Sequence, residues 1–217
     1  ALELDPDYGG ARVVLGWAFQ FDWTNRWAEN PTLAYSQAVE EAEKAIALDN
    51  NDAGAHALRA WIHVQKGEQN EALAAAEKAT RLQPGGADMA HVYSMVLVQS
   101  GRPEEAIKWS NRSKRLHPNR PPVMDWTLAE ALRLLGRYEE MIEVSKYILD
   151  KNNGGMWWEH ARLAFAYMKI GLEQEARDQV EEMLVGNPQR VQAWLAGVSP
   201  LPEPMEADFV GTLRKAR

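Results

Sequence analysis

A period of 34 to 35 residues runs through most of the chain and limits the folds open to it. Four glycines mark the period, with spacings of 34, 35 and 35 residues: Gly67, Gly101, Gly136 and Gly171. A small residue precedes each glycine by seven positions: Ala60, Ser94, Ala129 and Ala164. Five positions after each glycine stand Ala72, Ala106, Met141 and Ala176. Because three markers keep one register, the chain consists of repeated units of similar structure.

Each unit fits two helices joined by a tight turn. Apolar residues follow helical spacing over residues 55–66, and Gly67 suits the left-handed conformation that ends many helices. A second helix is predicted over 71–82, and Pro84 ends it because proline cannot continue the backbone hydrogen bonds. The small residues of each unit would let the two helix backbones approach closely. We therefore expect an all-α array of about five helical hairpins.

The register assigns most of the chain to this array and leaves a short segment at each end. Residues 1–8 match the end of a second helix, with Pro6 in the closing proline position. Residues 191–217 lose the register, and their amphipathic part, 205–217, is expected to form a helix that caps the last apolar face of the array. The array itself covers 9–190, and its expected hairpins are 9–52, 53–86, 87–120, 121–155 and 156–190.

The first hairpin carries an insertion of about ten residues relative to the period. Asn30 has the side chain of a helix N-cap, and Pro31 suits the first helical position. The insertion is therefore expected to extend the second helix backwards. It would also add a bend that contains Trp23 and Trp27.

The spacing of Ala60, Gly67, Ala72, Ala79 and Pro84 resembles the tetratricopeptide repeat consensus. The resemblance covers residues 9–190 and implies a right-handed superhelix of hairpins with a protein-binding concave groove. The sequence departs from the family in one respect, because it lacks the tryptophan often found early in the first helix. Arg12, His56, Ala90, Asp125 and His160 stand at that position.

A narrower resemblance concerns the repeat modules found behind bacterial adenylate or guanylate cyclase domains. It rests on residues 27–31, on Gly101-Arg102-Pro103-Glu104-Glu105-Ala106, and on the ending over 209–216. The resemblance implies that the array is an accessory module of a larger bacterial signalling protein. No part of a cyclase active site is present in the sequence.

The register also predicts which side chains would face the concave groove. The residue after the small residue of each first helix points away from the second helix, and residues about one turn away share its face. Aromatic residues, Met and Arg, which protein interfaces concentrate, occur among these positions. Trp61, Met95, Arg133 and Phe165 are expected to be partly exposed along one continuous groove. The full set of expected groove residues is Trp17, Trp61, Gln65, His91, Met95, Gln99, Glu130, Arg133, Phe165 and Lys169.

Composition argues against several other classes of protein. The formal net charge is −7, whereas nucleic-acid-binding domains usually carry a basic face. The chain has no cysteine, and the histidines lack the convergent partners that a metal site needs, so neither a metal nor a cofactor is expected. No apolar stretch suits a membrane span, and no catalytic motif is recognised, so we expect a cytoplasmic protein that is not an enzyme.

Two functions remain for a chain of this kind. The first is a scaffold that binds a protein or peptide in its concave groove. The alternative is a self-association module, in which two copies pair so that an upstream catalytic domain dimerises.

Overall fold

The chain folds into helices arranged in two compact units, Ala1–Asn119 and Arg120–Arg217. The computed structural model describes residues 1–24, 28–152, 156–186, 188–196 and 205–216. The boundary between the units lies one residue before the end of the third expected hairpin, 87–120. The all-α hairpin architecture predicted from the period is confirmed.

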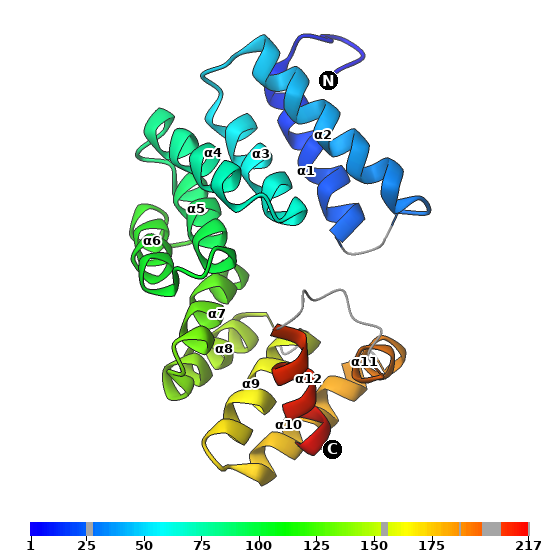
Figure 1. Cartoon of the computed structure of the whole chain (residues 1–217), viewed down its shortest axis with the longest axis vertical. Coiled ribbons are helices and arrows are strands. Elements are labelled where there is room, and N and C mark those ends of the chain that lie inside the picture. The colour runs from blue at the N-terminus through cyan, green and yellow to red at the C-terminus, as the bar shows by residue number, and fades with distance from the viewer. Residues whose placement is uncertain (25–27, 153–155, 187, 197–204, 217) are drawn as a thin grey trace. The chain divides into compact units, whose positions relative to one another are not determined.

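Unit 1 consists of three consecutive hairpins, each made of a first and a second helix that pack side by side (Figure 1). Besides its own hairpin partner, each later first helix also contacts the preceding first helix and the preceding second helix. The six helices are α1 (Gly9–Thr24), α2 (Pro31–Leu48), α3 (Ala53–Lys66), α4 (Gln69–Leu82), α5 (Ala87–Gln99) and α6 (Pro103–Leu116).

Unit 2 contains two further hairpins, α7–α8 and α9–α10, followed by two more helices. The short 3-10 helix η1 (Pro122–Asp125) leads into α7. Its helices are α7 (Trp126–Leu134), α8 (Tyr138–Lys151), α9 (Trp157–Lys169), α10 (Glu173–Gly186), α11 (Pro188–Leu195) and α12 (Met205–Ala216). Within the described residues, no helix is long and apolar enough to cross a membrane.

Local capping explains where the helices begin and end. The side chain of Asn30 accepts a hydrogen bond from the Leu33 amide at 3.1 Å, and Pro31 is the first residue of α2, so this predicted start is confirmed. Asp52 caps α3 in the same way, at 2.9 Å from the Ala55 amide. The four periodic glycines have φ angles of 69° to 80°, a backbone conformation that residues with a Cβ atom rarely adopt. Each glycine therefore reverses the chain between two helices.

The helices of each hairpin meet at the small residues of the repeat. Ala60 and Ala72 have no exposed surface, and the same holds for Ser94 and Ala106. We call the small residue in the first helix the crossing residue: Gly16, Ala60, Ser94, Ala129 or Ala164. At Gly16 a Cβ atom would lie 2.4 Å from the side chain of Leu58 in the next hairpin, so a larger residue there would displace that side chain.

Successive hairpins pack through residues on either side of the crossing residue. Leu58 and Ile62 of α3 lie two positions before and after Ala60. They form a buried cluster with Ala38 and Ala42 of α2, the second helix of the preceding hairpin. The small α2 side chains accept the larger α3 side chains, and this apolar burial joins the two hairpins.

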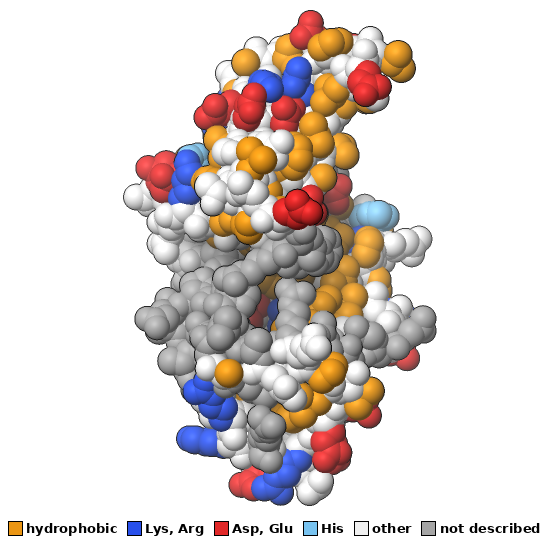
Figure 2. Space-filling model, turned by 90° about the vertical axis from the view of Figure 1, so that its right-hand side faces the viewer, with side chains coloured by type: hydrophobic (Ala, Val, Ile, Leu, Met, Phe, Trp, Pro, Cys, Tyr) orange, Lys and Arg blue, Asp and Glu red, His pale blue; other side chains and the backbone are white. Residues whose placement is uncertain are grey.

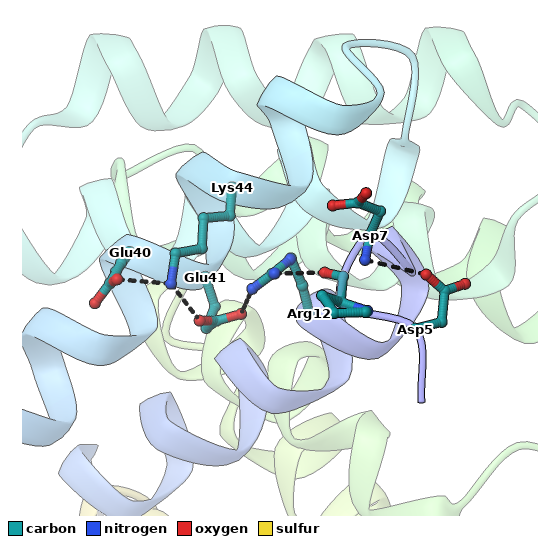
Figure 3. Close-up of polar contacts among 7 residues, drawn as sticks. Asp5, Asp7, Arg12, Glu40, Glu41 and Lys44 are labelled. Atoms are coloured by element: carbon teal, nitrogen blue, oxygen red, sulfur yellow. Dashed lines mark hydrogen bonds and ion pairs between the residues drawn. The ribbon is translucent and has the colours of Figure 1, made fainter. Parts of the chain in front are cut away.

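A polar network links α1 to α2 within the first hairpin (Figure 3). Arg12 of α1 donates to Glu41 of α2 at 3.0 Å and to the backbone oxygen of Pro6 at 2.5 Å. Lys44 pairs with Glu40 at 2.6 Å and with Glu41 at 3.2 Å. The pKa of the exposed Glu40 carboxyl is lowered by its hydrogen bond with Lys44. Arg12 occupies the position where the consensus of the family has tryptophan. Its ion pair with Glu41 links α1 to α2 at this position.

Residues 1–6, which are expected to match the end of a second helix, do not form a helix in this structure. These residues form turns, with the Asp5 amide donating to the Ala1 oxygen at 2.9 Å. Leu4 is 92% exposed. A segment this short cannot stabilise a helix without an apolar partner surface, and no such partner covers Leu4 in the described part of the chain.

The C-terminal helix α12 packs on α9, α10 and α11. Its buried side chains, Val210, Leu213 and Ala216, recur at helical spacing and form one apolar stripe. This is the position expected of a capping helix. The side chain of Phe209 and the prolines at 200, 202 and 204 lie outside the described residues, as does Trp27.

The helix crossings lead to a test of the repeat register. Ala106→Leu adds a large side chain to a fully buried crossing of α5 and α6. Such overpacking costs about 1–3 kcal/mol, which would lower the melting temperature by roughly 2–4 °C per kcal/mol for a chain of this size. Lys108→Leu, at an exposed position of the same helix, is the control and should change it little. Thermal unfolding followed by circular dichroism measures both, and equal shifts would contradict the register.

Candidate functional site

The first helices of unit 1 present one common face. The helices α1, α3 and α5 contact one another in turn, and their crossing residues keep the same register. Positions one and five residues after each crossing residue therefore lie on the same side of the three helices. We call this the first-helix face of unit 1. It comprises Trp17, Phe21, Trp61, Gln65, Met95 and Gln99, together with His91, which lies one turn before Met95 on the same side of α5.

The residues directly after the crossing residues of α3 and α5 form the floor of this face. Trp61 is 8% exposed and Met95 is 9% exposed, and His91 is also buried. The expectation that Trp61 and Met95 are partly exposed is therefore wrong. Neighbouring first helices pack directly against each other, so side chains at this position fill the space between them. Truncating Trp61 would remove core packing as well as a possible binding contact.

The residues one turn further along form an accessible rim. Gln65 and Gln99 of this rim are half-buried, and so is Trp17, which occupies the floor position of α1. Phe21 is 54% exposed, and its ring centroid lies 6.2 Å from that of Trp17. Phe21 is not among the groove residues predicted from the sequence. Its position five residues after Gly16 is the pattern that could have identified it.

In unit 2 the structure brings together the four predicted residues of α7 and α9. Arg133 pairs with Glu130 at 2.7 Å, and both side chains are largely buried. The Arg133 guanidinium lies 5.8 Å from the Phe165 ring centroid, and the Lys169 ammonium lies 5.1 Å from it. The ring of Tyr138 meets Phe165 edge to face at 6.0 Å. Cations at these distances are attracted to the faces of aromatic rings.

Phe165 is 1% exposed, so the expectation of partial exposure is wrong for this residue as well. Its ring belongs to the core of unit 2 and supports the cations around it. Lys169 is exposed, and Glu130 and Arg133 keep some accessible surface. Of the four predicted residues of unit 2, only the three charged ones are accessible for a binding contact, and the aromatic ring lies beneath them.

The predicted residues are divided between the two compact units. Six of them belong to unit 1 and four to unit 2. The residues of each set lie on neighbouring first helices of their own unit. The first set combines aromatic rings and Met with the amide groups of two glutamines, which both donate and accept hydrogen bonds. The second set combines cations and a carboxylate with a buried ring.

Three of the five histidines have hydrogen-bond partners close to them. His56 Nε2 lies 3.0 Å from the Asn50 backbone oxygen, His63 Nδ1 lies 2.5 Å from Glu68, and His160 Nδ1 lies 2.8 Å from Gln179. In the part of the chain that the structure describes, no group of three or more His, Asp or Glu side chains could hold a metal ion.

His56 is fully buried at the start of α3, and burial lowers its pKa below the usual value of 6.5. Its Nδ1 atom has no hydrogen-bond partner among the described residues. A neutral imidazole that donates from Nε2 to Asn50 fits both observations.

The geometry described so far is that of a tetratricopeptide-type array. The family model of the tetratricopeptide repeat matches residues 53–85, which contain the hairpin α3–α4. No protein of curated function matches the sequence.

Several solved structures share the fold at low sequence identity. PilW, a widely conserved type IV pilus biogenesis factor, is 17% identical, with a TM-score of 0.71 over 96% of this chain and 88% of that chain. TTC0263, a thermophilic tetratricopeptide repeat protein of Thermus thermophilus, is 18% identical, with a TM-score of 0.68 over 96% and 98%. YrrB, a tetratricopeptide repeat protein with an unusual peptide-binding site, is 18% identical, with a TM-score of 0.58 over 92% and 96%.

The environment of His56 predicts a pH-dependent stability. Because the folded pKa is lowered, the stabilisation is complete above the unfolded pKa of about 6.5 and is lost as the pH falls through the folded pKa. His56→Gln keeps an amide donor for the Asn50 oxygen and removes the titration. From about pH 7.5 to about pH 5, the melting temperature should fall more for the wild type than for the variant. Parallel curves would contradict the buried neutral histidine.

Proposed function

We propose that the chain is a protein- or peptide-binding scaffold without catalytic activity, and that the first-helix face of unit 1 holds the partner. The observation that carries the proposal is the shared register of three adjacent first helices. It repeats an apolar floor and an accessible rim across α1, α3 and α5.

The chemistry of this face suits a peptide segment with apolar side chains. Exposed aromatic rings such as Phe21 offer large apolar contact area at small entropic cost. Gln65 and Gln99 can bond the backbone of an extended segment, because an amide pairs with both N–H and C=O groups. A bound segment would cross the three helices and meet one rim residue of each.

The charged residues of unit 2 are proposed as a separate set of contacts. Lys169, with Arg133 and Glu130, would interact with polar or acidic groups of a partner. The buried ring of Phe165 would hold the two cations in place.

The similarity to YrrB supports binding as the general role, since YrrB is a tetratricopeptide repeat protein with a peptide-binding site. The resemblance to modules behind nucleotidyl cyclase domains supports a finer proposal, that the array is an accessory part of a bacterial signalling protein. Self-association is the alternative function. Sedimentation velocity over a concentration series distinguishes a monomeric scaffold from a self-associating module.

Rim substitutions test the proposed binding face. Peptides would be selected on the full chain by phage display, and their affinity measured by fluorescence anisotropy. Phe21→Ala combined with Gln99→Ala should weaken binding by roughly 30-fold, since loss of interface anchors costs about 2 kcal/mol or more. Because both side chains have accessible surface, the variant should keep its helical circular dichroism and most of its melting temperature.

Leu48→Ala is the matched control. Leu48 is also an exposed apolar residue of unit 1, but it lies at the end of the second helix α2. Its truncation should leave the affinity unchanged. If the selected peptides bind the rim variant as tightly as the wild type, this face does not hold the partner.

A further inference from the structure

Two apolar residues of α1 are exposed to solvent, whereas the equivalent residues of α3 and α5 are buried. Val14 and Ala18 lie two residues before and after the crossing residue Gly16. Val14 is 70% exposed, and Ala18 is also exposed. Figure 2 shows hydrophobic side chains reaching the surface in the upper part of the molecule, where α1 and α2 lie in Figure 1.

The equivalent residues of the next two first helices show what this surface is suited to contact. In α3 they are Leu58 and Ile62, which pack against Ala38 and Ala42 of the preceding second helix. In α5 the equivalent residues, Val92 and Val96, are buried. A pair of small residues, one turn apart on a second helix, is thus the surface that accepts this part of a first helix.

The composition of α1 agrees with a buried environment. Its only charged residues are Arg12, which pairs with Glu41, and Asp22 near its end. A helix that is apolar around most of its circumference is normally covered on most sides. Yet α1 contacts α2 on one side and α3 on another, and Val14 stays exposed.

Among the described residues, the second helices of another copy of this chain offer no exposed pair of small residues. The second helices carry residues equivalent to Ala38 and Ala42 at regular positions, and all of them are buried in the described structure. They are Ala72 and Ala76, Ala106 and Ser110, Met141 and Ser145, and Ala176 and Val180. This burial favours, as the partner, a hairpin other than those of residues 9–190.

We infer that α1 is a docking surface for one more helical hairpin of the same register. Its second helix would carry small residues one turn apart and would run into residues 1–6. Pro6 precedes α1 by three residues, as Pro84 precedes α5. Ala1 and Leu4 then correspond to Ala79 and Leu82 at the end of α4. The added hairpin would cover Val14 and Ala18 as α2 covers Leu58 and Ile62.

A fusion of the chain with part of itself tests this docking surface. Residues 53–78 are joined directly to Ala1 of the full chain, so that α3 and most of α4 continue into residues 1–6 in the native register. Val14→Asp is then introduced into the fusion and into the unfused chain. The aspartate would be buried only in the fusion. The substitution should therefore lower the melting temperature of the fusion by about 5 °C or more, and that of the unfused chain by about 1 °C.

Val185→Asp is the matched control, because Val185 of α10 is 81% exposed and lies far along the chain from α1. This substitution should lower the melting temperatures of the fusion and of the unfused chain by the same small amount. Hydrogen exchange provides a second measurement, in which the amides of α1 should exchange more slowly in the fusion than in the unfused chain.

Three outcomes would overturn the inference. The first is an equally small effect of Val14→Asp in the fusion and in the unfused chain. The second is rapid exchange throughout the added residues, which would mean that the α1 surface does not support a hairpin. The third is a dimer of the unfused chain that Val14→Asp dissociates, since a second copy would then occupy the surface. Peptide binding by the rim residues can fail without affecting any of these results.

Discussion

The close approach of two helices at each crossing residue is the constraint on which the other contacts depend. Ala60 meets the second helix of its hairpin with no exposed surface, and Ser94 does the same in the next hairpin. Small side chains at this point fix the distance between the helix axes. Positions two residues away then face the preceding hairpin, while the next position faces the neighbouring first helix. One small residue per hairpin thereby orients both the core and the first-helix face.

The two units use this common geometry for different chemistry. In unit 1 the position after the crossing residue holds Trp61 or Met95, and amide groups lie at the rim. In unit 2 the same position holds Glu130, which is paired with Arg133, or Phe165, which lies beneath two cations. Backbone geometry fixes where these side chains lie, so the surface chemistry can differ between hairpins without a change of fold.

The repeat period predicted the fold well because the recurring residues mark where helices end and where two helices cross. The positive φ at Gly67 and the side-chain cap at Asn30 are local features that a single residue type reveals. Exposure within the predicted groove was harder to predict. The direction of Phe165 follows from helical spacing, but its ring contacts Tyr138 of α8 and Arg133 of α7, and no local pattern predicts these contacts. Phe21 was missed because the insertion hides its register.

The hairpin α1–α2 differs from the others of unit 1 in how its two helices are joined. It contains no glycine turn at the usual position, and both of its helices are longer than those of the next hairpin. The additional residues lie beyond the crossing at Gly16, so they do not alter the distance between the helices. Chain length can therefore change at this tip at little cost in stability, because longer loops add closure entropy only slowly. An epitope or a fluorescent reporter inserted at this point would leave the packing of the later hairpins intact.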